Sequence, residues 1–193
     1  MYYKVLLDGK SFHGGEFEWS LPKNGKPGKW HSVTGELMMC LHGLHLTDNP
    51  QKWWDRNAKC YEVEYKDALE PAEDKICVRK VRLVRELTHD DLAKLQIFYS
   101  GEHVVKSGTA LAYDSSSVTA CNSSSVEAYG SSSVTAYNSS SVTAYDSSSV
   151  EAYGSSTVNS RFHTGNVTVS HNAIHINRDT TPPTIRGNYQ GGK

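Results

Sequence analysis

The feature that most constrains this chain is an eight-residue repeat in its C-terminal half. Residues 112–159 divide into six consecutive octads of the type Ala-Tyr-Asp-Ser-Ser-Ser-Val-Thr. Valine and alanine keep strict register throughout, and variation is concentrated at the Asp/Asn/Gly position and at the residue after valine. A fixed period of this kind indicates an architecture in which each unit packs on its neighbours.

Each octad joins a strand-like Ser-Val-Thr-Ala stretch to a residue suited to a tight turn. Alternation places Val118 and Ala120 on one side of the strand, and Ser117 and Thr119 on the other. Stacked copies would form a thin core of Val, Ala and inward Ser. Three successive serines disfavour a helix, and the strict register argues against an unstructured linker. The repeat therefore predicts a β-solenoid.

The length of each coil of the solenoid stays open. Two octads per coil give a flat, two-sided coil. However, Gly130 and Gly154 are separated by three octads, as are Glu127 and Glu151, which also fits a three-sided coil. We expect the solenoid to span 106–178, with strands after residue 165 closing the stack, and we expect 179–193 to be a flexible tail.

The N-terminal region, 1–105, is expected to be an α+β globular domain. Apolar or alternating stretches predict strands at 2–7, 37–46, 60–65 and 76–87. Pro50 follows a capping residue and predicts a helix start, and Thr88 is expected to cap a helix over 90–99. The predicted fold is thus an α+β domain followed by an all-β solenoid.

The overall composition narrows the function. Net charge is −1, from 20 basic and 21 acidic residues, so no strong field attracts nucleic acid or an anionic membrane. No apolar run is long enough to span a membrane or to form a signal peptide. Four cysteines without a Cys-x-x-Cys pair favour reduced thiols. We expect a soluble cytoplasmic protein without a cofactor.

Reactive side chains concentrate in the N-terminal region. Cys40, His42 and His45 include zinc-ligand types, but His45 lies beyond Gly43, and we interpret the trio as a buried cysteine with two hydrogen-bonded or exposed histidines. No metal or catalytic residue is assigned. The catalytic candidates considered are His13, His31, His45 and Glu64, and Glu64 shares with Glu62 the side of a strand that we expect to face solvent.

Three stretches resemble known families. The pattern Pro-Gly-x-Trp-His at 27–31, with Gly43-Leu44-His45 and later elements, resembles an uncharacterised domain of actinobacteria and their phages. More distantly, 43–47 followed by 60–64 resembles small ADP-ribosyltransferases of the rifampin-modifying type. That resemblance implies an early histidine against a nicotinamide cofactor, for which His13 is the nearest candidate. The octads resemble the repeats of bacterial ice-nucleation proteins.

These observations favour a binding protein, and we leave open whether it is also an enzyme. The leading hypothesis is a phage-type accessory protein that binds and inhibits a host protein or protein complex in the host cytoplasm, as an anti-defence factor. Its solenoid would act as a binding scaffold or would pair two chains as a homodimer. The expected binding residues are Trp30, Trp53, Ser117, Thr119, Ser125, Glu127, Tyr129, Ser133, Thr135, Tyr137, Ser141, Thr143 and Tyr145.

Two alternatives remain. The first is an ADP-ribosyltransferase-like or nucleotide-binding enzyme in the N-terminal domain. The second is binding of ice or glycan by the Ser/Thr ladder. Such binding requires an uninterrupted hydroxyl array, and Glu127 and Glu151 interrupt it.

Overall fold

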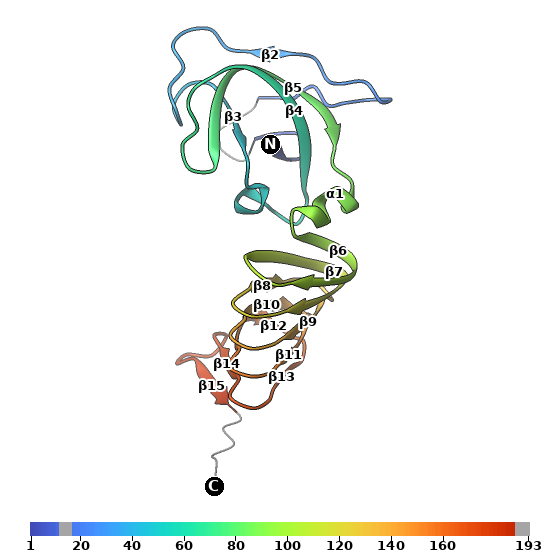
Figure 1. The fold of residues 1–193 in the computed structure, drawn as a ribbon, viewed down its shortest axis with the longest axis vertical. Helices are drawn as coiled ribbons and strands as arrows, with labels where there is room; N and C mark the ends of the chain where they lie inside the picture. Colours follow the sequence, from blue (N-terminus) through green and yellow to red (C-terminus); the bar gives the residue numbers. More distant parts are fainter. Residues whose placement is uncertain (12–16, 188–193) are drawn as a thin grey trace. The chain divides into compact units, whose positions relative to one another are not determined.

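The computed structural model describes residues 1–11 and 17–187. It divides into two compact units, Met1–Asp91 and Leu92–Lys193, and each is considered by itself. Strands dominate both units (Figure 1). Within the described residues, no helix combines the length and the apolar character needed to cross a membrane.

The first unit is a small antiparallel barrel-like sheet. Its strands are β1 (Tyr3–Leu7), β2 (His31–Ser32), β3 (Leu44–Thr47), β4 (Ala58–Ala68) and β5 (Lys75–Glu86). They follow the order β2-β5-β3-β1-β4, and β4 also pairs with β5. This extra pairing closes β5, β3, β1 and β4 into a ring, so that their inward side chains share one core.

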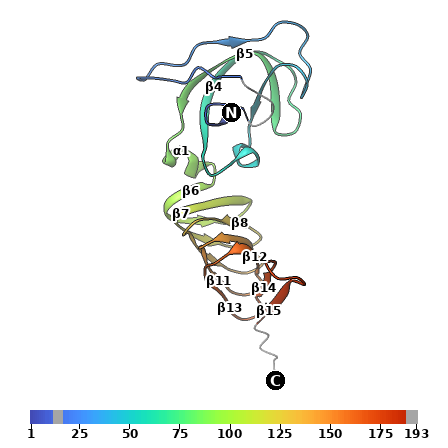
Figure 2. The same cartoon turned by 180° about the vertical axis from the view of Figure 1, so that it is seen from behind.

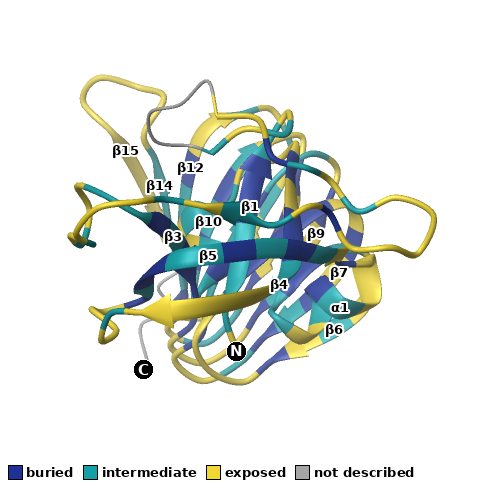
Figure 3. Cartoon of the chain, turned by 90° about the horizontal axis from the view of Figure 1, so that it is seen from above, coloured by how far each residue is buried: buried dark blue, intermediate teal, exposed yellow. Residues whose placement is uncertain are grey.

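That core is built by alternation along the strands. Leu6 of β1, Tyr61 of β4 and Val78, Val81 and Leu83 of β5 are almost completely buried in one cluster. The second half of β4 is exposed, as its yellow end in Figure 3 shows. The core therefore occupies only the closed part of the ring.

The expectation of an α+β domain is wrong. The helix expected after Pro50 is a single 3-10 turn, η1 (Pro50–Trp53). The helix expected over 90–99 is α1 (His89–Lys94), which ends because Gln96 adopts a φ of 57°. Ile97 and Phe98 then bury themselves as strand residues against Leu111 and Ala112. Tertiary pairing thus overrides the helical spacing of Leu92, Leu95 and Phe98.

The N-terminus of α1 is as the sequence predicted. The Thr88 hydroxyl accepts the Asp91 backbone N–H at 3.2 Å, and the Asp91 carboxylate accepts the Thr88 N–H at 3.2 Å. This reciprocal arrangement is a capping box. It forms whether or not the rest of the predicted helix does, because it depends only on residues 88–91.

The second unit is a parallel β-solenoid (Figures 1 and 2). Its strands are β6 (Ile97–Val105), β7 (Thr109–Ala120), β8 (Ser125–Ala128), β9 (Ser133–Ala136), β10 (Ser141–Asp146), β11 (Ser149–Ala152), β12 (Thr157–His163), β13 (Val167–Val169), β14 (Ile174–Asn177) and β15 (Thr184–Gly187). The order β13-β11-β9-β7-β8-β10-β12-β14-β15 runs down one face and up the other. The long β7 turns the corner, since Thr109–Ala112 pairs with β8 and Ser117–Ala120 pairs with β9.

The register settles the coil size. Val126 lies opposite Val142, and Val134 lies opposite Val150, so successive coils are offset by two octads. Two octads therefore form one coil with two faces, and a coil of three octads is excluded. β6 lies within the expected N-terminal region 1–105 but belongs to this sheet. β15 lies within the expected tail 179–193 but pairs antiparallel with β14.

The solenoid core is as thin as the octad predicts. Each valine and each alanine of the repeat is at most 1% exposed. The middle serine of each octad is buried with them, and Ser140, for example, donates its hydroxyl to the Tyr137 carbonyl at 2.8 Å. Turn residues such as Asp114 and Asn138 adopt φ values of 50° and 59°, as expected for Asp, Asn and Gly. The prediction of a β-solenoid with a Val, Ala and Ser core is confirmed.

Replacing Ala136 by leucine tests how closely the core is packed. Ala136 is fully buried between Ala120 and Ala152 of the adjacent coils, so a larger side chain must separate them. We expect the free energy of unfolding to fall by about 1–3 kcal/mol, measured by urea unfolding with far-ultraviolet circular dichroism. The control is Thr135→Leu on the outer side of the same strand, for which we expect a change below about 0.5 kcal/mol. Equal losses in both variants would contradict this packing.

Candidate functional site

The barrel-like sheet of the first unit opens between β1 and β3. These strands pair only at Tyr3 and Thr47, and beyond that point they separate. Lys4 bridges the opening, because its Nζ donates to the His45 carbonyl oxygen at 3.1 Å. The Lys4 side chain therefore replaces a backbone hydrogen bond that the separated strands no longer make.

Lys4 lies on the same side of β1 as Leu6, which belongs to the barrel core. Its Nζ lies 4.9 Å from the ring centroid of Trp19, a core residue that is 6% exposed. The amine thus sits against an aromatic wall, at the edge of the apolar interior. A cation in this setting is favoured by the aromatic ring but disfavoured by the loss of water.

A pocket of about 580 Å³ occupies this opening, which is within the usual range for small-molecule sites. Its walls come from β1, β3, the loop before β3, η1 and the start of β5. The described lining residues are Tyr3, Lys4, Val5, Ser11, Phe17, Trp19, Val33, Cys40, Leu41, His42, Gly43, Leu44, His45, Leu46, Thr47, Trp53 and Lys75. Eight of these 17 residues are aromatic or basic, and the other nine are aliphatic or small.

The lining is electrostatically one-sided. Lys4 and Lys75 both contribute to it, and among the described residues no Asp or Glu side chain lines the pocket. Burial, followed by the positive charges of Lys4 and Lys75, lowers the pKa of His45. The imidazole is therefore held neutral by the same cations that would attract an anionic ligand.

Asp74 holds Trp53, which lines the pocket, although Asp74 itself is not a lining residue. Its carboxylate accepts hydrogen bonds from Trp53 Nε1 at 2.7 Å, Lys52 Nζ at 2.9 Å and Thr47 Oγ1 at 3.2 Å. Burial alone would raise the pKa of Asp74, but these three donors lower it to about 2. Lys75 Nζ lies 4.6 Å from the Trp53 ring centroid. Asp74 thus holds the indole of Trp53 through its N–H group, and Lys75 contacts the face of the ring.

Of the four catalytic candidates from the sequence, the three that the structure describes do not contact one another. His13 lies outside the described residues. His31 Nε2 accepts the Ser20 backbone N–H at 2.9 Å and packs against Phe17 and Trp19, outside the pocket lining. Glu64 lies on the exposed end of β4 and pairs with Arg82 at 2.6 Å. Of the three described candidates, only His45 lines the pocket.

The metal candidates Cys40, His42 and His45 all line the pocket. The Nε2 atom of each of the two histidines has a backbone partner. His42 Nε2 lies 2.7 Å from the Thr34 carbonyl oxygen, and His45 Nε2 accepts the Cys40 backbone N–H at 2.9 Å. Cys40 itself is exposed, contrary to the interpretation as a buried cysteine. Across residues 1–11 and 17–187, no three His, Cys, Asp or Glu side chains are grouped as a metal site would require.

The two tryptophans predicted to bind have different surroundings. Trp53 lines the pocket. Trp30 lies away from it and contacts three cations, since Lys66, Lys80 and Arg82 lie 5.6, 5.2 and 4.9 Å from its ring centroid. Trp30, which immediately precedes β2, thus contacts side chains of both β4 and β5.

The solenoid residues predicted to bind are divided between its two faces. One face carries the outward residues of β8 and β10, and the opposite face carries those of β7 and β9. The first set is Ser125, Glu127, Ser141 and Thr143, and the second set is Ser117, Thr119, Ser133 and Thr135. They therefore form two separate arrays rather than one ladder.

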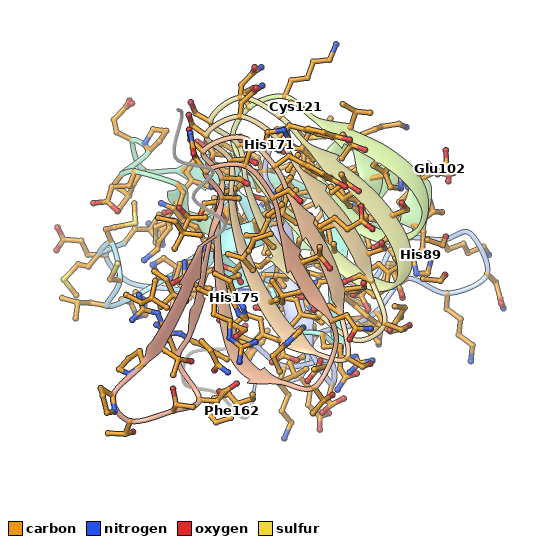
Figure 4. The ribbon with its side chains drawn as sticks, turned by 90° about the horizontal axis from the view of Figure 1, so that it is seen from below. His89, Glu102, Cys121, Phe162, His171 and His175 are labelled. Atoms are coloured by element: carbon orange, nitrogen blue, oxygen red, sulfur yellow. The ribbon has the colours of Figure 1, made fainter. Side chains whose placement is uncertain are left out.

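The tyrosines are also divided, between two corners of the coil. Tyr129 stacks on Tyr145 at 4.7 Å, whereas Tyr137 stacks on Tyr153 at 5.3 Å. Cys121 and His171 lie at the second corner, and Phe162 lies on the opposite side (Figure 4). Within each corner, ring stacking buries part of the apolar surface of the tyrosines. The Tyr129 hydroxyl also donates a hydrogen bond to the Glu127 carboxylate at 2.6 Å.

Sequence reasoning missed Lys4, Lys75, Trp19 and Asp74 as parts of a site. One signal was present: Lys4 interrupts the apolar run Tyr-Tyr-Lys-Val-Leu-Leu on the same strand side as Leu6. A lysine at a core position of a strand needs an explanation. The comparisons with known proteins do not supply one, since no family model, curated protein or solved structure matches this chain.

Replacing Asp74 by asparagine tests the wall behind Trp53. The carboxylate loses its charge and its strong hydrogen bonds, so we expect the free energy of unfolding at pH 7 to fall by about 2 kcal/mol. The folded-state pKa of Asp74 lies below the ordinary 3.8, so its contribution is present above pH 4 and is lost as the pH falls towards 2. Urea unfolding at several pH values measures this. A difference between wild type and D74N that does not shrink between pH 4 and 2 would count against it.

Replacing Lys4 by methionine tests the burial of the amine. Burial lowers the pKa of Lys4 from 10.5 to about 8, so between these values the unfolded state binds more protons than the folded state. The wild type should therefore gain stability relative to K4M as the pH rises from 8 to 10.5, by up to about 3 kcal/mol. The neighbouring His45 and Lys75 are present in both proteins. A constant difference in unfolding free energy over this pH range would show that the amine is hydrated.

Proposed function

We propose that this is a binding protein whose first unit binds a small organic anion with a flat ring, of the nucleotide class. The observation that carries the proposal is the pocket between β1 and β3. Its described lining combines two lysines with tryptophan and phenylalanine side chains, and includes no carboxylate. Such a lining favours negative charge and planar apolar surface in the same ligand.

The arrangement of the lysines supports this pairing of charge and ring. Lys4 lies over Trp19, and Lys75 lies over Trp53. A phosphate or carboxylate held by either ammonium group would therefore keep the rest of the ligand beside an indole ring. The hydrogen bonds of Asp74 hold Trp53 before any ligand arrives, which reduces the entropy cost of binding.

The same geometry favours binding over ADP-ribosyl transfer. Glu64 faces away from the pocket in an ion pair with Arg82, and His31 is engaged by the Ser20 backbone. A transferase would need an acidic group close to the bound ring and sugar. We therefore propose nucleotide binding, which was one part of the alternative drawn from the sequence, and we do not propose ADP-ribosyl transfer.

We propose a scaffold role for the solenoid. Its outward positions are serine and threonine at regular spacing, on two faces with a shared backbone pairing pattern. A rigid array of this kind suits the display of a surface to another protein. Thr119 and Thr135 lie next to each other on adjacent coils, but the next residue in the same row is Glu151. This interruption of the hydroxyl array disfavours ice binding. The phage-type inhibitory role, its host partner and the homodimer stay predictions.

Calorimetric titration of the full chain with adenosine 5′-monophosphate tests the pocket. We expect the monophosphate to bind and adenosine to bind more weakly, because only the former carries an anion. Lys4→Met and Lys75→Met should each weaken binding at least about tenfold, since each removes a charge-assisted hydrogen bond.

The matched control is Lys66→Met, which removes the same charge on exposed β4, outside the pocket. It should leave the affinity unchanged. Equal binding of the monophosphate by the wild type and K75M, or a loss in K66M as large as in K75M, would refute the proposed site.

A further inference from the structure

We infer that Lys4 forms a reversible imine with an anionic aromatic aldehyde bound in the pocket between β1 and β3. This inference rests on the proposed function, because the aldehyde must first be held there. It adds a covalent step that binding alone does not require.

The geometry around Lys4 supplies the first argument. The Nζ atom donates to one oxygen, that of the His45 carbonyl, and otherwise faces the Trp19 ring and the pocket. In the described part of the chain, no carboxylate pairs with it. Lysines that serve structure in a protein interior normally pair with an acid. An amine without one is free to react.

The second argument concerns the charge state. The amine is partly buried on the core side of β1, and among the described residues the basic groups that line the pocket with it are His42, His45 and Lys75. None of them supplies negative charge. Burial lowers the pKa of Lys4 to about 8, so about a tenth of the amine is uncharged at pH 7. Only the uncharged form is a nucleophile.

The third argument is the position of the reactive group relative to the rest of the site. Lys75 also lines the pocket, and its amine lies over Trp53. We expect an anionic group held by Lys75 to leave the ring of the ligand beside Trp53, in the same pocket that Lys4 lines. One lysine then binds the anion while the other reacts, which is the division of roles that their different surroundings favour.

The chemistry balances without an added redox reagent. The Lys4 nitrogen lone pair attacks the aldehyde carbon, and the carbonyl oxygen takes a proton to give a carbinolamine. The nitrogen then loses its remaining proton as the hydroxyl leaves, so one water is released and a C=N bond replaces the C=O bond. Hydrolysis reverses these steps and returns the free amine.

The test uses the full chain with pyridoxal 5′-phosphate as the probe and cyanoborohydride to reduce any imine to a stable amine. Peptide mapping by mass spectrometry locates the adduct. We expect Lys4 to be labelled at least about tenfold faster than Lys66, an exposed lysine of β4 that lies outside the pocket. Lys4→Arg, which keeps the charge but cannot form an imine, should abolish the main adduct, and Lys66→Arg should not.

Pyridoxine 5′-phosphate, which has the ring and the phosphate but no aldehyde, separates the two proposals. We expect it to bind by calorimetry and to protect Lys4 from labelling. If it binds but Lys4 is labelled no faster than Lys66, the imine is refuted and the anion site stands. If neither pyridoxal 5′-phosphate nor pyridoxine 5′-phosphate binds, the imine is refuted, and the titration with adenosine 5′-monophosphate decides the anion site. The comparison of Lys4 with Lys66 within the wild type does not depend on the folding of a variant.

Discussion

Pairing of backbone N–H and C=O groups between short strands is the constraint on which both units depend. Few strands here could bury enough apolar surface to be stable alone, so each must pair with a neighbouring strand. The solenoid meets this demand by repetition, because every coil offers the next one an identical edge two octads further along the chain. The first unit meets it by closure, since β4 pairs with both β1 and β5.

The candidate site lies where closure is incomplete. β1 and β3 share a single register pair, and the Lys4 side chain supplies the next hydrogen bond in place of the backbone. The Lys4 amine therefore lies beside Trp19, at the pocket between the two strands. The opening, its positive charge and its aromatic wall thus have one structural origin. A barrel with a complete β1–β3 ladder would have neither the pocket nor the perturbed lysine.

The sequence predicted those features that depend on neighbouring residues in the chain, and it did not predict those that depend on distant strand pairing. The solenoid, its inward Val and Ala and its turn residues were predictable because a strict octad repeats the same local information. The helix over 90–99 was not, because the spacing of Leu92, Leu95 and Phe98 fits a helix equally well, and only the distant pairing of Ile97 with Leu111 decides against it. The pocket was also hidden, since Lys4, Trp53 and Lys75 meet through strand order. No pattern in the sequence states which strands are neighbours.

A nitrogen–proton NMR titration of the full chain with adenosine 5′-monophosphate tests the central claim most directly. The four indole N–H groups report on different places, because Trp19 and Trp53 line the pocket while Trp30 and Trp54 do not. The account predicts saturable shifts of the Trp19 and Trp53 indole signals and of the backbone amides around Lys4 and His45. Shifts centred on Trp30 or on the solenoid, or no shifts at all, would contradict it.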